Sequence, residues 1–399
     1  MKPNFDQVIS SVVRNLPPSG IRRFFDLVAS TKGVISLGVG EPDFVTPWHI
    51  REKCIYSLEK GHTMYTSNHG MLELREGIAQ YLNEQYQVKY KPESEIIVTI
   101  GASEAVDIAL RAIINPGDEV LIPEPCFVSY KPCTVLAGGV PVTINTNASN
   151  GFKVTPQQLE SHITNKTKAL IICYPNNPTG AVMSKDDLFA IAKIVNKHNL
   201  IVISDEIYSE LNYQGQHTSF ASLPEMRDRT ILLNGFSKSF AMTGWRIGYV
   251  CAHEELVAAM VKIHQYSIMC ASIMAQEAAI EALKNGRPHV DDMVNQYNYR
   301  RRLVVAKLNE IGLECFEPKG AFYAFPSIKI TGLSEVEFAE KLLEEEKVAV
   351  IPGTAFGECG KGHIRISYAA SIQNISEALH RIGSFVQRNS NKIPALYSI

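Results

Sequence analysis

The sequence lacks the features that mark metal-binding, redox and membrane-spanning proteins. Its eight cysteines are scattered and include no CxxC pair, which argues against a zinc ribbon or a thioredoxin-type site. Scattered thiols suit a reducing cytoplasm. No apolar run approaches the roughly 20 residues that a transmembrane helix needs, and the first residues form no apolar stretch of signal-peptide length. We therefore expect a cytoplasmic protein with no metal site and no membrane span.

An excess of charge of either sign is also missing. The 39 Lys and Arg residues nearly balance the 41 Asp and Glu residues, and the formal net charge is −2. A protein that holds nucleic acid by counterion release needs a basic field, which this composition does not supply. With 45% hydrophobic and 20% charged residues, the chain has a globular composition. Small molecules are therefore the expected partners, and no nucleic acid is expected.

The order of the apolar segments predicts an α/β protein with two domains. A chain of 399 residues is too long to fold around one small hydrophobic core. From about residue 95, short apolar segments alternate with helical patterns, which indicates a largely parallel sheet covered by helices. The expected strands are 96–100, 120–122, 169–173, 200–204, 230–234 and 247–251. Two of the expected helices are 185–198, with Ser184 as N-cap, and 254–269.

The pattern changes after about residue 285, where a second lobe is expected. Two long helices, an acidic helix and one strand-like segment follow each other there, which is typical of an α+β lobe. These segments are 291–310, 320–326, 334–346 and 372–387. The predicted division is 1–45 for an N-terminal arm and part of the small domain, 46–285 for the large domain and 286–399 for the C-terminal small domain. Pro17-Pro18-Ser19-Gly20 ends the arm.

The strongest local motif is GFSKSFAMTGWRIG at 235–248, in which Lys238 lies among small residues just after a strand. A lysine whose amine is desolvated can lose its proton and form an imine with an aldehyde. Ser237 and Arg246 in the same segment could both hold a phosphate. A single lysine after a strand is more often a surface residue, so this segment by itself does not establish catalysis.

A second motif, SDEIY at 204–208, follows the apolar strand 200–203. Open α/β sheets place ligands at the carboxyl ends of their strands. Asp205 at that point could keep a pyridine nitrogen protonated, because a carboxylate favours the charged ring. Taken alone, Asp-Glu after a strand is most often a charge at a helix N-terminus.

Two turns complete the candidate site. The segment YPNNPTG at 174–180 has turn-forming residues and would alone be read as a plain turn. The segment TIGASEA at 99–105 leads from a strand into a helix through small residues. A helix start offers free N–H groups and a positive dipole end to an anion, so Ala102 and Ser103 are candidate phosphate contacts.

These segments together resemble the class I/II pyridoxal 5'-phosphate (PLP) dependent aminotransferases of fold type I. The resemblance runs from about residue 20 to residue 388, and it is closest to the bacterial branch described as aspartate, alanine, aromatic or acetyl-diaminopimelate aminotransferases. It implies a large domain with a mostly parallel seven-stranded sheet covered by helices and a smaller α+β domain. It also implies a homodimer with shared active sites.

The resemblance also implies roles for single residues around the cofactor. Lys238 would bind PLP as a Schiff base and shuttle the substrate proton. Tyr208 and Asn177 would hydrogen-bond the phenolic oxygen, and the Asn177-Pro178 bond would be cis. Phe127 would stack on the pyridine ring, and Tyr65 would cross the dimer interface to the phosphate. The full implied cofactor set is Lys238, Ala102, Ser103, Phe127, Asn177, Asp205, Tyr208, Ser237, Arg246 and Tyr65, with Lys238, Asp205 and Tyr208 as its catalytic members.

For the substrate, the resemblance implies that Arg365, with Gly40 and Asn177, binds the α-carboxylate, since a guanidinium fork matches a planar carboxylate. The activity implied is a ping-pong transfer of an amino group from an L-amino acid to a 2-oxo acid. Alanine, aspartate or an aromatic amino acid is the expected donor, and 2-oxoglutarate or pyruvate the expected acceptor. A PLP-dependent carbon-sulfur lyase and a PLP-binding regulator are the alternatives.

Strict aspartate specificity is not expected from the residues at two aligned positions. Ile263 lies near the position where one branch carries an arginine for the distal carboxylate, and Ser103 where another branch carries a lysine. Neither side chain can pair with a carboxylate. Lys262 or a residue of a second subunit could take over that role.

Overall fold

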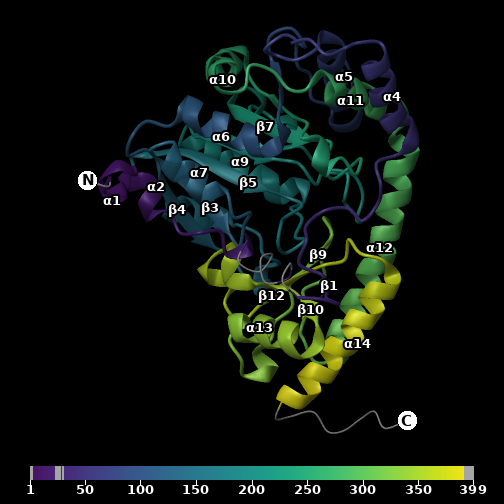
Figure 1. Cartoon of the computed structure of the whole chain (residues 1–399). Coiled ribbons are helices and arrows are strands. Elements are labelled where there is room, and N and C mark those ends of the chain that lie inside the picture. Colours follow the sequence, from purple (N-terminus) through teal and green to yellow (C-terminus); the bar gives the residue numbers. More distant parts are fainter. Residues whose placement is uncertain (1–2, 23–27, 29–30, 391–399) are drawn as a thin grey trace.

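The computed structural model describes residues 3–22, 28 and 31–390, and a seven-stranded sheet forms the centre of its larger part (Figure 1). The strand order is β2-β8-β7-β6-β5-β3-β4, and all neighbours are parallel except β8, which is antiparallel to both β2 and β7. The bounds are β2 Ile96–Thr99, β3 Glu119–Glu124, β4 Val140–Asn145, β5 Thr167–Cys173, β6 Ile201–Asp205, β7 Thr230–Gly235 and β8 Gly248–Cys251. The predicted mostly parallel sheet is confirmed.

Strand β4 was not predicted, and its burial explains why. Its two end residues are exposed, three further residues are half-buried, and only Ile144 is fully buried. A strand at the edge of a sheet has no need of a continuous apolar run. The six predicted strands, in contrast, are buried along most of their length.

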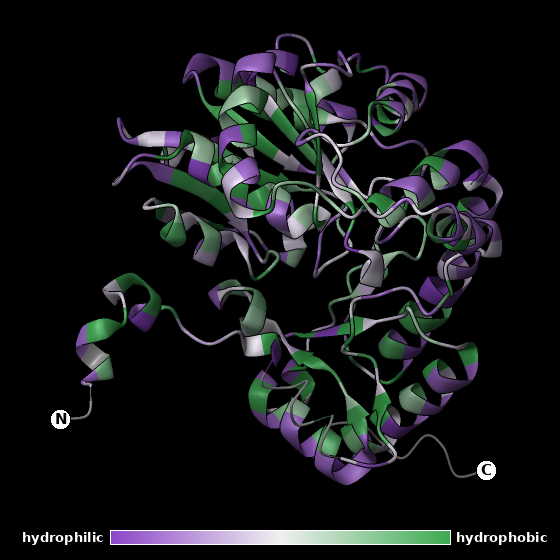
Figure 2. Ribbon diagram, turned by 45° about the horizontal axis from the view of Figure 1, so that its top comes forward, coloured by the Kyte–Doolittle hydropathy of each residue, from purple (hydrophilic) through white to green (hydrophobic). Residues whose placement is uncertain are grey.

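Helices cover both faces of the sheet, which is why its central strands are apolar throughout. In the central strand β7, Ile231 and Leu233 belong to one buried cluster, while Leu232 belongs to another on the opposite face. Figure 2 shows the same arrangement as hydrophobic strands inside a shell of helices with hydrophilic outer sides. The helices of this part are α4 Trp48–Glu59, α5 Leu72–Tyr86, α6 Gly101–Ile113, α7 Tyr130–Leu136, α8 Pro156–Ser161, α9 Lys185–Lys197, α10 Glu254–Ser267 and α11 Ile273–Asn285. The predicted N-cap of α9 is confirmed, since Ser184 Oγ accepts from the Asp187 N–H.

The smaller part contains a three-stranded antiparallel sheet, β11-β12-β9, packed with long helices. A further strand, β1 (Ile35–Ser36), comes from the N-terminal region and pairs with β10. The other bounds are α12 Arg287–Glu310, β9 Tyr323–Ala324, α13 Glu335–Glu346, β10 Val348–Ala349, β11 Ile351–Pro352, β12 Ile364–Ser367 and α14 Ile372–Asn389. The domain boundaries at residues 45 and 285 stay a prediction.

The N-terminal arm lies at the periphery of the molecule, where α2 approaches α7 (Figure 1). It contains α1 (Phe5–Val8) and α2 (Ser11–Asn15), and the apolar side chains of Phe5, Val8 and Val13 are exposed. In the part of the chain that the structure describes, no helix combines the length and the apolar character needed to cross a membrane.

Close backbone packing joins β8 to the start of α6. A Cβ atom on Gly248 would lie 2.8 Å from the carbonyl carbon of Gly101 and 2.9 Å from the amide nitrogen of Ala102. Distances this short force the backbone to move, because no flexible side-chain end is involved. Glycine at position 248 therefore allows β8 to lie directly against the backbone at the start of α6.

We predict that Gly248→Ala lowers the free energy of unfolding by about 1–3 kcal/mol, the usual cost of overpacking a core. The midpoint of urea unfolding, followed by fluorescence, measures the loss. Gly244→Ala is the matched control, because a Cβ atom there meets nothing within 4 Å. Equal midpoints for the two variants would contradict the packing argument.

Candidate active site

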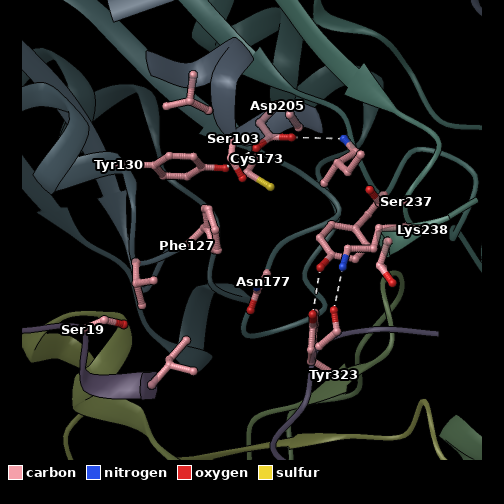
Figure 3. A pocket seen from close by; sticks show the side chains of 18 of the residues that line it. Ser19, Ser103, Phe127, Tyr130, Cys173, Asn177, Asp205, Ser237, Lys238 and Tyr323 are labelled. Atoms are coloured by element: carbon pink, nitrogen blue, oxygen red, sulfur yellow. Dashed lines mark hydrogen bonds between the residues drawn. The ribbon is translucent and has the colours of Figure 1, made fainter. Parts of the chain in front are cut away.

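A cavity of about 590 Å³ lies at the carboxyl ends of the parallel strands (Figure 3). Cys173 ends β5, Asp205 ends β6, and Ser237 and Lys238 directly follow β7. Because β5, β6 and β7 are parallel neighbours, these ends meet at one edge of the sheet.

Eleven of the twelve residues predicted for the site line this cavity. They are Gly40, Ala102, Ser103, Phe127, Asn177, Asp205, Tyr208, Ser237, Lys238, Arg246 and Arg365. The twelfth, Tyr65, does not line it and is 79% exposed. The individual roles given to these residues stay predictions.

The amine of Lys238 is enclosed by protein although the side chain faces the cavity. Its Nζ donates to the carbonyl oxygen of Gly40 at 2.6 Å, and it lies 5.9 Å from the ring centroid of Phe322. Burial lowers the pKa of Lys238 to about 8, because the ammonium form is poorly solvated there. The amine can therefore be neutral near physiological pH, as a nucleophile requires.

Asp205 is buried and is held by two donors. It accepts from the Tyr130 hydroxyl at 2.7 Å and from the Ile207 N–H at 3.2 Å. Burial raises the pKa of Asp205 to about 6, although the bond from Tyr130 acts in the opposite direction. A carboxylate of this kind can share a proton with a basic ring nitrogen near neutral pH.

One end of the cavity is suited to a phosphate group. The first turn of α6 contributes Ala102 and Ser103, where helix N–H groups have no partner within the helix. Arg246 packs directly against this turn, since a Cβ atom on Gly101 would lie 2.7 Å from its Nη2. Arg246 Nη1 donates to the Thr243 carbonyl at 2.9 Å, which fixes the guanidinium. A helix start and a guanidinium together favour a doubly charged anion.

Another part of the cavity is suited to a carboxylate. Arg365 in β12 is buried; it donates to Asn177 Oδ1 at 2.9 Å and to the Gly38 carbonyl at 2.5 Å. Its Nε–H is buried and has no hydrogen-bond partner among the described residues. Because an unpaired buried donor costs free energy, this N–H favours binding of an acceptor from outside the chain.

Two tyrosines of the site were not predicted from the sequence. Tyr130 contacts Asp205 as described above, and the Tyr323 hydroxyl lies 2.8 Å from that of Tyr208. A Cβ atom on Gly40 would overlap the Tyr323 hydroxyl, so the glycine allows the tyrosine to approach. Nothing in the local sequence marks either tyrosine, because their partners are 75 and 115 residues away.

Of the three positions considered for substrate specificity, only one lies at the cavity. Ser103 lines the cavity, whereas Ile263 and Lys262 do not. Ile263 packs against the core, and Lys262 is exposed on α10. The Asn177-Pro178 bond is cis, as the resemblance implies.

Comparison with known proteins identifies relatives over nearly the whole chain. The sequence profile of the Aminotransferase class I and II family matches residues 32–382. The chain is 56% identical to the Bacillus subtilis protein YugH, over 96% of this chain and 99% of that protein. It is 49% identical to an aspartate aminotransferase of Pyrococcus abyssi, over 92% of this chain and 95% of that protein. The crystal structure of an aromatic aminotransferase from Pyrococcus horikoshii superposes with a TM-score of 0.88 at 48% identity, covering 92% and 99% of the two chains.

The pKa of Lys238 leads to a prediction for the cofactor-free protein. The reactivity of Lys238 toward acetic anhydride should rise about tenfold per pH unit below pH 8 and level off above it, because only the neutral amine reacts. An ordinary lysine continues to gain reactivity up to about pH 10.4. Mass spectrometry of the Lys238 peptide measures the profile, and a steep rise beyond pH 9 would contradict the lowered pKa.

Proposed function

The chain belongs to the class I and II aminotransferases, which are PLP-dependent enzymes, and from this premise we propose its reaction. It transfers the α-amino group of an L-amino acid to a 2-oxo acid by a ping-pong mechanism. The proposed donor is alanine, aspartate or an aromatic amino acid, and the proposed acceptor is 2-oxoglutarate or pyruvate. The observation that carries the proposal is the meeting of Lys238, Asp205 and Arg365 in one cavity. Relatives named as aspartate and aromatic aminotransferases support it.

The residues of the cavity fit PLP by the chemistry of their donors. Arg246 and the first turn of α6 offer a guanidinium and N–H groups to the phosphate, with Ser237 beside them on the wall. Asp205 would pair with the ring nitrogen, and Tyr208 and Asn177 would donate to the phenolic oxygen. Phe127 projects into the cavity, where its ring could cover the pyridine ring (Figure 3).

When bound, PLP supplies an electron sink for the pair left behind when the Cα–H bond of the substrate breaks. Asp205 keeps a proton at the ring nitrogen, which strengthens that sink, and Tyr130 holds the carboxylate in place. Once the substrate amine has displaced it from the cofactor, Lys238 Nζ would take the proton from Cα as a base and deliver it to the cofactor's C4' carbon as an acid. Its lowered pKa suits this exchange near neutral pH.

Arg365 fixes the substrate for that proton transfer. Its free Nε–H and its two bonded Nη groups form a preorganised fork for the α-carboxylate, with Asn177 beside it. Because the guanidinium is already held by Asn177 and Gly38, little ordering is needed when the substrate binds.

We also propose a homodimer with shared active sites in the cytoplasm. Tyr65 is 79% exposed, so its implied contact with a phosphate would require the site of a second subunit. Apolar side chains on α4 and in the arm, including Trp48, Tyr56 and Phe5, are exposed and could be covered in a dimer. All eight cysteines are free, which suits a reducing compartment.

The proposed reaction is tested by single half-reactions. Purified enzyme with bound PLP, mixed with alanine, aspartate or phenylalanine and no acceptor, should form one 2-oxo acid per active site and then stop, while the visible absorbance changes. Lys238→Ala should form none, because it removes the group that moves the proton. Lys193→Ala, an exposed lysine on α9, is the matched control.

Two other outcomes would contradict transamination. Continued release of ammonia and a 2-oxo acid without an acceptor would indicate a lyase. Bound cofactor whose absorbance no amino acid changes would indicate a regulator.

The bond between Tyr130 and Asp205 leads to a separate prediction. Tyr130→Phe removes a donor that favours the carboxylate, so the pKa of Asp205 should rise above its value of about 6. We expect the acidic limb of the pH profile of kcat/KM to move upward, so that kcat/KM below pH 6 falls about tenfold for each unit by which the pKa rises, while the loss at neutral pH is smaller.

Tyr86→Phe serves as the control for this prediction. It removes another buried tyrosine hydroxyl, which bonds Glu210 at 3.2 Å and does not line the cavity. If both variants shifted the pH profile equally, the role of Tyr130 would be rejected.

A further inference from the structure

One cation of the cavity has no role in the reaction described above. Arg22 lines the cavity together with Ser19 and Ile21. The other cations there are held in place: Lys238 by Gly40 and Arg246 by Thr243, while Arg365 bonds Asn177 and Gly38. The guanidinium of Arg22, in contrast, has no hydrogen bond or ion pair among the residues that the structure describes, and the residue is exposed.

The backbone that presents Arg22 is anchored on the body of the protein. The Arg22 N–H donates to the Ser19 carbonyl at 3.1 Å and closes a turn. Ile21 packs against the main hydrophobic core. Gly20 lies against η6 (Gly353–Phe356), since a Cβ atom there would be 3.2 Å from the Ala355 Cβ. This short segment is therefore a fixed part of the cavity wall.

The segment faces the reacting groups across the cavity. Figure 3 shows Ser19 on one side of the opening and Lys238 with Tyr323 on the other. Arg365 stacks on Tyr323, with its guanidinium carbon 4.5 Å from the ring centroid. A substrate held by its α-carboxylate at Arg365 and by its α-carbon at Lys238 would thus extend its side chain toward the wall that carries Arg22.

The residues that line the cavity favour one class of substrate side chain. The lining of the cavity as a whole also includes the apolar side chains of Ile21, Val106 and Val128. An unpaired guanidinium in a partly apolar cavity favours a short aliphatic chain that ends in a carboxylate. An arginine fork is the side chain best matched to such a group.

We propose that Arg22 binds the side-chain carboxylate of a dicarboxylic substrate, either an acidic amino acid or the matching 2-oxo diacid. This inference rests on the proposed aminotransferase reaction and names the substrate class of the same site. It supplies, from the same chain, the cation that is missing at Ile263 and Ser103. Aspartate is then a substrate in spite of those two residues.

The test compares Arg22→Gln with the wild-type enzyme, both with PLP bound. Maleate, a dicarboxylate that cannot transaminate, is titrated by calorimetry, and kcat/KM is measured for aspartate and for alanine. We expect the Kd of maleate to rise roughly 10- to 100-fold, the usual effect of losing a charge-assisted hydrogen bond. The ratio of kcat/KM for aspartate to that for alanine should fall by about tenfold or more.

Arg14→Gln is the matched control, because Arg14 is exposed on α2 and donates to the Ile9 carbonyl outside the cavity. It should change neither the maleate Kd nor the ratio. Arg22→Lys should keep part of the aspartate preference, since the charge remains but the fork is lost.

Two results would overturn the inference: an unchanged Kd of maleate in Arg22→Gln, or equal losses for aspartate and alanine. Failure of the proposed reaction itself would look different. In that case neither the wild-type enzyme nor any Arg22 variant would transaminate an amino acid.

Discussion

The site depends on the cost of burying ionisable groups beside one another. Lys238, Asp205 and Arg365 all lose solvent around the same cavity, and burial disfavours the charged form of each. The pKa of Lys238 falls to about 8 while that of Asp205 rises to about 6, so both pKa values lie near neutral pH. Proton transfer between such groups and a substrate requires little driving force. The shifted pKa values of Lys238 and Asp205 therefore follow from their burial around the cavity.

Burial on this scale needs partners that hold each group, and these come from segments far apart in the chain. Asn177, which follows β5, accepts from Arg365 in β12 at 2.9 Å. The hydroxyls of Tyr208 and Tyr323 lie 2.8 Å apart. The distance between Arg365 and Lys238 is thus set by how these segments pack. A change in that packing would misplace the substrate even if every side chain remained.

Much of the fold could be predicted because its signals are local. The buried strands β5, β6 and β7 are continuous apolar runs, and the residues after them carry polar side chains at one edge of the sheet. Strand β4 escaped prediction because it keeps exposed positions at one edge of the sheet, unlike β2 at the other edge, which is buried along its length. In the site, Lys238 and Asp205 lie in motifs that can be read along the chain. Tyr130 and Tyr323 do not, because each meets its partner only after distant segments pack together.

The sequence by itself determined the α/β layering and the family, since both rest on residue patterns within short segments. It also determined which side chains could supply the chemistry. The tertiary structure alone decided which of them share a cavity: it brought Arg22 of the N-terminal segment to the cavity that Lys238 also lines, and left Lys262 outside. The physical reason is that a cavity is enclosed by segments far apart in the chain, whose approach depends on side-chain packing and not on local pattern.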